Sequence, residues 1–106
     1  MDMDDLQLGG NIVLSGFKVF DRSSMVILKK IIGNYARKLS EVSDNFERLH
    51  LTIKPIHTTP EGKVKKFELN GKLLDNGKAH NASVTEHNVF VGVDSVLKKL
   101  ETIQRD

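Results

Sequence analysis

The chain has 106 residues, 39% of them hydrophobic and 28% charged, which suits a soluble globular protein with room for one hydrophobic core. No apolar run approaches the roughly 20 residues that span a bilayer, and the lack of cysteine excludes disulfide scaffolds and thiol catalysis. The net charge is +2, but residues 11–106 hold 16 Lys and Arg against 11 acids, a balance of +5. A basic body favours an anionic partner such as a nucleic acid, although a mixed charged surface is the alternative.

The N-terminal segment, residues 1–8, is expected to be a disordered acidic tail, because it carries like charges and offers little to bury. No signal-type apolar stretch follows these acids, so a cytoplasmic protein is expected. Residues 9–106 are expected to form a single domain. Its first element is a short apolar strand over residues 11–17, bounded by glycines.

A long helix is predicted to begin near Met25, with Asp21, Ser23 or Ser24 as its cap, and to end near residues 43–45. Its apolar residues recur every three or four positions and share one face. These are Leu28, Ile32, Tyr35, Leu39 and Val42. Gly33 costs about 1 kcal/mol relative to alanine within this helix, but the pattern still predicts one continuous element.

Three two-faced strands are predicted next. Leu49, Leu51 and Ile53 alternate with polar residues in the first, and Phe67, Leu69 and Leu73 do so in the second. Residues 55–63 are read as a loop because they contain both prolines, and Gly71 is a candidate bulge. The Asp75-Asn76-Gly77 sequence predicts a type I′ hairpin, which leads into an edge strand over residues 78–85.

The last helix is predicted to follow a cap at Asn88 or Thr85. Its apolar stripe consists of Phe90, Val93, Leu97 and Leu100. The order β-α-β-β-β-α, with one apolar face on each element, predicts an α+β two-layer sandwich. We expect a four-stranded, mostly antiparallel sheet with both helices on one face, similar to double-stranded RNA-binding domains.

Two rows of cations are candidate RNA-binding residues. They are Lys29, Lys30, Arg37 and Lys38 on the first helix and Lys98, Lys99 and Arg105 on the last. If the helices lie side by side, these rows flank one groove, and clustered cations bind a phosphate backbone with release of counterions. The alternative is an ordinary solvated helix surface.

The open face of the sheet is a secondary candidate. It is expected to present Arg48, Lys54, Lys66 and Lys72. No aromatic residue of these strands is expected to point to the open face, so base stacking there is disfavoured. Recognition of RNA shape or of phosphates is compatible with such a face, and so is an ordinary hydrated surface. A structural or protein-interaction module that uses this open face is the rival function.

The chain lacks the residue patterns of an enzyme. His50, His57, His80 and His87 lack helical metal spacing and have no cysteine beside them. Nucleophile-elbow, phosphate-loop and dinucleotide fingerprints are also missing. We therefore expect no catalytic activity, metal, cofactor or small-molecule substrate.

Three segments together resemble one protein family. They are Leu14-Ser-Gly16, the alternating residues 49–54, and Asn88-Val-Phe-Val-Gly-Val-Asp94 followed by Lys98-Lys99-Leu100. The chain resembles the ribosome hibernation promoting factors, also called ribosome-associated inhibitor A or sigma-54 modulation proteins. The final helix is the most specific part of this resemblance, which covers roughly residues 11–105.

The resemblance implies a stress-response protein that inhibits translation. Members bind rRNA of the small ribosomal subunit, in the channel used by mRNA and tRNA, through basic residues of both helices. Lys99 and then Lys98 match the family by position, whereas Lys30, Arg37 and Lys38 match it only as a basic helix face. The resemblance further implies a chain that is monomeric off the ribosome and has no membrane partner. Double-stranded RNA-binding domains, in contrast, place their basic cluster at the very start of the last helix.

Overall fold

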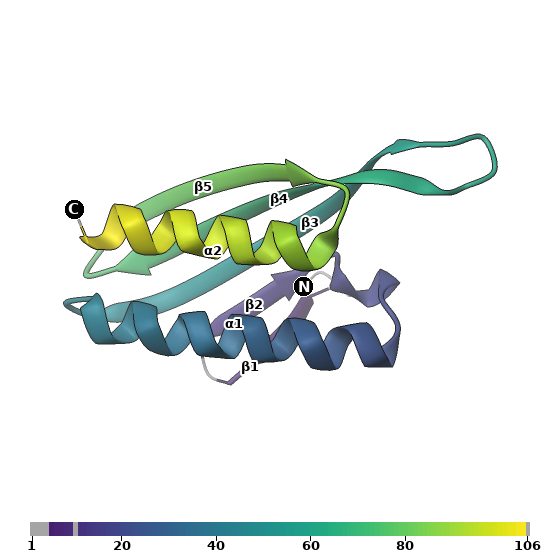
Figure 1. The fold of residues 1–106 in the computed structure, drawn as a ribbon. Coiled ribbons are helices and arrows are strands. Elements are labelled where there is room, and N and C mark those ends of the chain that lie inside the picture. The colour runs from purple at the N-terminus through teal and green to yellow at the C-terminus, as the bar shows by residue number, and fades with distance from the viewer. Residues whose placement is uncertain (1–4, 10, 106) are drawn as a thin grey trace.

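The computed structural model describes residues 5–9 and 11–105, with the side chains of all but residues 57, 58, 65 and 105. The elements in chain order are β1 (Asp5–Leu8), β2 (Ile12–Ser15), the 3-10 turn η1 (Phe17–Val19), α1 (Arg22–Val42), β3 (Phe46–Thr58), β4 (Val64–Asp75), β5 (Lys78–Glu86) and α2 (Val89–Arg105). Figure 1 shows α1 and α2 side by side on one face of a single sheet. The predicted α+β two-layer sandwich is therefore confirmed.

The sheet has five strands in the order β1-β2-β3-β4-β5, not the four expected. Only β2 and β3 are parallel, and α1 provides the crossover that a parallel pair needs. The additional strand, β1, lies within the segment that was expected to be a tail, and it pairs antiparallel with β2. Leu6 and Leu8 pack against the core, so burial of these two side chains outweighs the acidic composition. Residues 1–4 of the expected tail lie outside the described residues.

The core lies between the two helices and the sheet. From the strands it takes Leu14, Leu49, Leu51, Ile53, Leu69 and Leu73, and from the helices Leu28, Ile32, Ala36, Leu39, Val89, Val93, Val96, Leu97 and Leu100. The helical periodicity thus predicted most of the buried residues. Tyr35 and Phe90 are only half-buried, and Val42 is exposed. The buried face of each helix is therefore rotated slightly about the helix axis from the face that we predicted.

The predicted helix caps and hairpin turn are present. Asp21 Oδ1 accepts from Ser24 N (2.8 Å), and α1 runs unbroken through Gly33. Asn88 Oδ1 accepts from the backbone nitrogens of Phe90 (2.9 Å) and Val91 (3.2 Å), satisfying two free donors of α2. Asn76 (φ 51°) and the next residue, a glycine with φ 80°, form the two-residue turn between β4 and β5.

Gly71 is not a bulge but a contact point for α2. It pairs regularly with Leu51 and Ala82, and the strand irregularity lies instead between Phe46 and Arg48. A Cβ at Gly71 would lie 2.9 Å from Leu100 Cδ1. Gly92, on α2 itself, would bring a Cβ within 2.6 Å of Leu69 Cδ1. These two glycines allow α2 to approach β4 closely.

The strand β3 extends to Thr58, into residues 55–63, which the prolines led us to predict as a loop. Leu49 N donates to Asn11 O on the β2 side (2.9 Å), and alternate residues of a strand point to the same side. The nitrogen of Pro55 therefore faces the β2 side. Since β2 ends opposite Thr52, no ladder bond is lost there, which is the situation in which a strand tolerates proline.

Asp75 joins three parts of the fold. Its side chain, on β4, is only 5% exposed. Asp75 Oδ1 accepts a hydrogen bond from the backbone nitrogen of Asn45 (2.7 Å), which lies between α1 and β3. Asp75 Oδ2 accepts one from Gln104 Nε2 on α2. The Asn45 N–H, aided by the Gln104 amide, holds the pKa of the Asp75 carboxyl below its ordinary value of 3.8, although burial opposes this effect. The ionised carboxylate therefore stabilises the native state.

Two glycines provide a matched test of the backbone. Gly16 has φ 82°, and a Cβ there would lie 2.2 Å from Ile53 O, whereas Gly33 is helical and has nothing within 4 Å. We expect Gly16→Ala to lower the free energy of unfolding by about 1–3 kcal/mol and Gly33→Ala to raise it by about 1 kcal/mol. Urea denaturation measures both, and equal effects of the two changes would contradict the structure.

The pH dependence of stability tests Asp75. A pKa that is depressed in the folded state contributes stability above the unfolded pKa, and this contribution is lost as pH falls through the folded value. We expect Asp75→Asn to be less stable than the wild type at pH 7, and the difference to shrink below about pH 4. Glu61→Gln, in the exposed β3–β4 turn, serves as the control. A difference that is constant across this pH range would refute the role of the carboxylate.

Candidate nucleic-acid interface

The cations predicted for α1 are all exposed but point in different directions. Successive residues of a helix are rotated by about 100°, so Lys30 and Arg37 project away from the sheet. Lys38 is on the flank that faces α2. Lys29 is on the opposite flank, because the buried stripe of α1 lies between it and Tyr35.

The seam between the two helices contains acids as well as cations. The Tyr35 hydroxyl on α1 donates to the Asp94 carboxylate on α2. Partial burial, the bond to Asp94 and the negative charges of Asp94 and Glu101 raise the pKa of Tyr35 above 10.0. Lys38 Nζ lies 5.0 Å from the centroid of the Tyr35 ring, a cation–π distance. The seam between the helices is therefore a mixed cluster of acids and cations.

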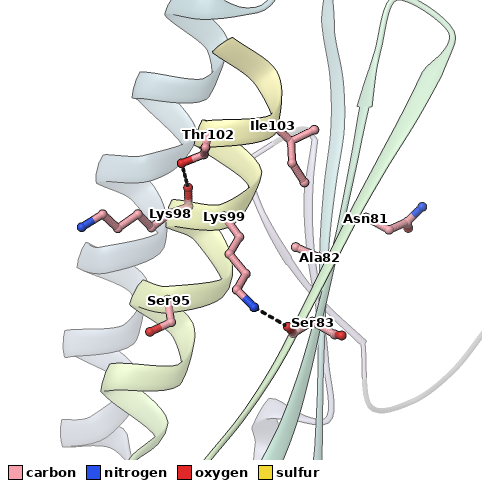
Figure 2. A pocket seen from close by; sticks show the side chains of 8 residues that line it. All are labelled: Asn81, Ala82, Ser83, Ser95, Lys98, Lys99, Thr102 and Ile103. Carbon is pink, nitrogen blue, oxygen red and sulfur yellow. Dashed lines mark hydrogen bonds between the residues drawn. The ribbon is translucent and has the colours of Figure 1, made fainter. Parts of the chain in front are cut away.

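The adjacent lysines of α2 diverge, as Figure 2 shows. Lys99 Nζ turns toward the sheet edge and donates to Ser83 O on β5 (3.2 Å). Lys98 extends to the other side of α2, and its carbonyl accepts from Thr102 Oγ1 (3.0 Å). The two lysines therefore do not line one shared inter-helix groove.

Lys99 contributes instead to a shallow groove of about 610 Å³ between α2 and the edge strand β5. The lining residues are Asn81, Ala82, Ser83, Ser95, Lys98, Lys99, Thr102 and Ile103. Carbon atoms form most of the surface of this groove, although several of its residues carry hydroxyl, amide or ammonium groups. The groove lies between the basic side of α2 and the edge strand β5.

Four of the predicted cations share the outward surface of the helical layer: Lys30, Arg37, Lys38 and Lys98. We call this set the outer patch. Lys29 and Lys99 lie on its two flanks, and the side chain of Arg105 is outside the described residues, although its backbone ends α2. The helices thus collect their cations on one broad surface.

The open sheet face carries the four secondary cations. Arg48, Lys54, Lys66 and Lys72 are exposed. All six aromatic residues of the chain belong to the core or pack against it, so the prediction that this face has no stacking aromatic is confirmed. A polyanion on this face would meet lysine and arginine, with no ring to hold a base.

Sequence reasoning missed a hydrogen-bonded chain on the open face. Ser15 Oγ lies 2.5 Å from Asp5 Oδ1 and 2.7 Å from His50 Nε2, which joins β1, β2 and β3. The carboxylate contacts the serine and not the imidazole, so this is not the order of a Ser-His-Asp triad. The alternation of residues could have placed Ser15 and His50 on the open face. Asp5, however, reaches Ser15 only because β1 pairs with β2, and we had not predicted β1.

The histidines whose side chains are described do not gather into a metal site. His50 lies on the open face, whereas His80 pairs with Leu73 and therefore lies on the helix side of β5. Within the described part of the chain, no group of three His, Cys, Asp or Glu residues could hold a metal ion. In the same part of the chain, no helix is long and apolar enough to cross a membrane.

No protein-family model matches the chain, and no curated protein matches it in sequence. Solved structures do match. The N-terminal domain of Protein Y from Thermus thermophilus aligns with a TM-score of 0.62 and 13% identity, over 94% of this chain and 97% of that one. A ribosomal subunit interface protein from Coxiella burnetii aligns with a TM-score of 0.55 and 16% identity, over 89% and 90%.

The chain shares the fold of these two proteins. The likeness extends over nearly the whole length of each chain, so it includes the sheet and both helices. The predicted resemblance to the hibernation-factor family is thereby confirmed at the level of the fold.

The single tyrosine of the chain reports on the seam between the helices. We expect ultraviolet titration of Tyr35 to give a midpoint above pH 10.0, and Asp94→Asn to lower this midpoint because it removes a neighbouring negative charge. Asp44→Asn, exposed at the end of α1, is the control and should leave the midpoint unchanged. An Asp94→Asn midpoint equal to that of the wild type would contradict the Tyr35–Asp94 contact.

Proposed function

We propose that this protein is a ribosome-associated translation inhibitor, a hibernation factor that binds small-subunit rRNA in the mRNA and tRNA channel. The observation that carries the proposal is the shared fold: one neighbour is named a ribosomal subunit interface protein and aligns over about nine-tenths of both chains. The cations of the outer patch, presented on the helical layer of that fold, support an RNA partner.

The proposed mechanism depends on shape and charge. The two helices lie parallel on a sheet and present Lys30, Arg37 and Lys98 outward on a preformed surface. Little side-chain or backbone ordering beyond these residues is then required on binding. The protein cations displace counterions that are condensed on the RNA phosphates, and the release of these counterions supplies the affinity. A protein bound in this way inhibits by occupying the space that mRNA and tRNA need.

Contacts in the seam between the helices and on the flanks affect how strongly individual lysines can bind phosphate. Lys38 already makes a cation–π contact with the Tyr35 ring, so it contributes less to a phosphate than Arg37 does. Lys99 can exchange its bond with Ser83 O for a phosphate oxygen, since a neutral acceptor at 3.2 Å is a weaker partner than an anion. The open-face cations, Arg48 and Lys72 among them, form a secondary surface for phosphates.

The proposal is tested by co-sedimentation with purified small ribosomal subunits at low and high salt. We expect binding at low salt that weakens steeply as salt rises. The double variant Arg37→Glu/Lys98→Glu should bind much more weakly, with the slope of log K against log salt reduced by at least about 1.4, because about 0.7–0.9 is lost per phosphate contact.

The matched control is Arg22→Glu/Lys78→Glu, which makes the same change in net charge at exposed positions outside the outer patch. It should retain most of the affinity. If the folded Arg37/Lys98 variant binds as the wild type does, the helix surface is not the site. Binding that does not respond to salt would instead favour a protein-interaction module that uses the open sheet face.

A further inference from the structure

The most prominent feature of the molecule outside the helical layer is the β3–β4 hairpin, which projects from the end of the sheet (Figure 1). The parallel strand β2 ends opposite Thr52, and β5 ends opposite Phe67. Beyond these points β3 and β4 pair only with each other, at Ile56↔Lys66 and Thr58↔Val64. Beyond the end of β5, three strand residues on each side, 56–58 and 64–66, correspond to a projection of about 10 Å before the tip.

This hairpin is held in shape by its own contacts. At its tip, Thr59 N donates to Lys63 O (2.8 Å), Gly62 N donates to Thr59 O (2.9 Å) and Lys63 N donates to Thr59 Oγ1 (3.0 Å). At its base, the rings of Phe67 and Phe20 lie 5.6 Å apart, which joins β4 to the segment before α1. Pro55 further restricts the backbone. A projecting element that is already ordered loses little entropy when it binds.

The charged side chains of the hairpin are mostly cationic. Residues 54–66 contain four lysines and one acid, Glu61, a local balance of +3. Of these lysines, Lys54, Lys63 and Lys66 have described side chains and are exposed. Lys54 and Lys66 have the same parity in the register and project on the same face as Lys72. Lys66 pairs with Ile56, two residues beyond Lys54, so the two lysines are offset by about 7 Å along the strand direction.

We propose that the β3–β4 hairpin is a second RNA-binding element, separate from the helices, which lays its lysines along a phosphate backbone. The inference rests on the proposed function, because the RNA is taken to be that of the small subunit. A two-stranded ribbon is narrow enough to lie in the wide, shallow minor groove of an RNA helix. Within the described residues 54–66 no aromatic side chain is available for stacking, so the contact reads backbone and shape.

A second contact at the end of a rigid arm changes how the protein binds. Once the helix surface is bound, the hairpin meets its own RNA segment at high effective concentration, so a weak second contact raises the overall affinity. The hairpin also sets orientation, since two separated contacts permit one register of the protein on the subunit. An acidic ribosomal protein is the other occupant that these lysines could meet, and the experiment below distinguishes the two.

Site-directed cleavage of rRNA tests the location directly. The chain has no cysteine, so Glu61→Cys at the hairpin tip and Asn34→Cys on exposed α1 each carry one tethered iron–EDTA group. In the subunit complex we expect both positions to cleave rRNA, at different nucleotides. Cleavage from position 34 alone would overturn the hairpin inference and leave the proposed function standing. Failure of the wild-type protein to bind subunits would overturn both.

Charge reversal then tests the lysines. We expect Lys63→Glu/Lys66→Glu to bind more weakly and to reduce the salt slope by about 1.4–1.8, since two phosphate contacts are lost. Lys63→Arg/Lys66→Arg keeps the charge and should keep the slope. A normal slope in the folded Glu variant, or cross-linking of position 61 to a ribosomal protein with no cleavage of rRNA, would overturn the inference.

Discussion

The close approach of α2 to β4 is the constraint on which the rest of the structure depends. Gly71 on the strand and Gly92 on the helix leave no room for a Cβ, so the helix is seated directly on the sheet. This seating determines the direction of every side chain of α2. With α2 in this position, Asp94 faces Tyr35, Lys99 points toward β5 and Lys98 faces outward. A larger residue at either glycine would displace the helix that carries Lys98 of the outer patch.

The fold separates its charged surfaces. One face of the sheet is covered by α1 and α2, so cations on the outer helix surface cannot meet those on the open face, such as Lys72. The hairpin is a third region, because it extends past the ends of β2 and β5. A small single-layer sheet can in this way present several phosphate contacts over a molecule whose longest extent is 46 Å. Such an arrangement suits a large, folded RNA better than a compact ligand.

Much of the fold was predictable because its determinants are local. Asp21, Asn88 and the Asn76 turn act within a few residues, and the helical spacing of Leu28, Ile32 and Leu39 identified a real core face. The failures have non-local causes. β1 forms because two leucines reach a core built by distant elements, and Pro55 fits its strand only because β2 has already ended. The outward direction of the helical cations was predictable from spacing. The divergence of Lys98 and Lys99, and the acids in the seam, depend on how the two helices pack.

We propose that the outer surface of the helices meets rRNA in the channel of the small subunit. Hydroxyl-radical footprinting of small subunits, with and without the protein, tests it most directly. We expect protection of rRNA that lines the mRNA and tRNA channel, and loss of that protection when Arg37 and Lys98 are changed to glutamate. Protection confined to rRNA outside the channel, or the same channel footprint from the charge-reversed protein, would contradict it.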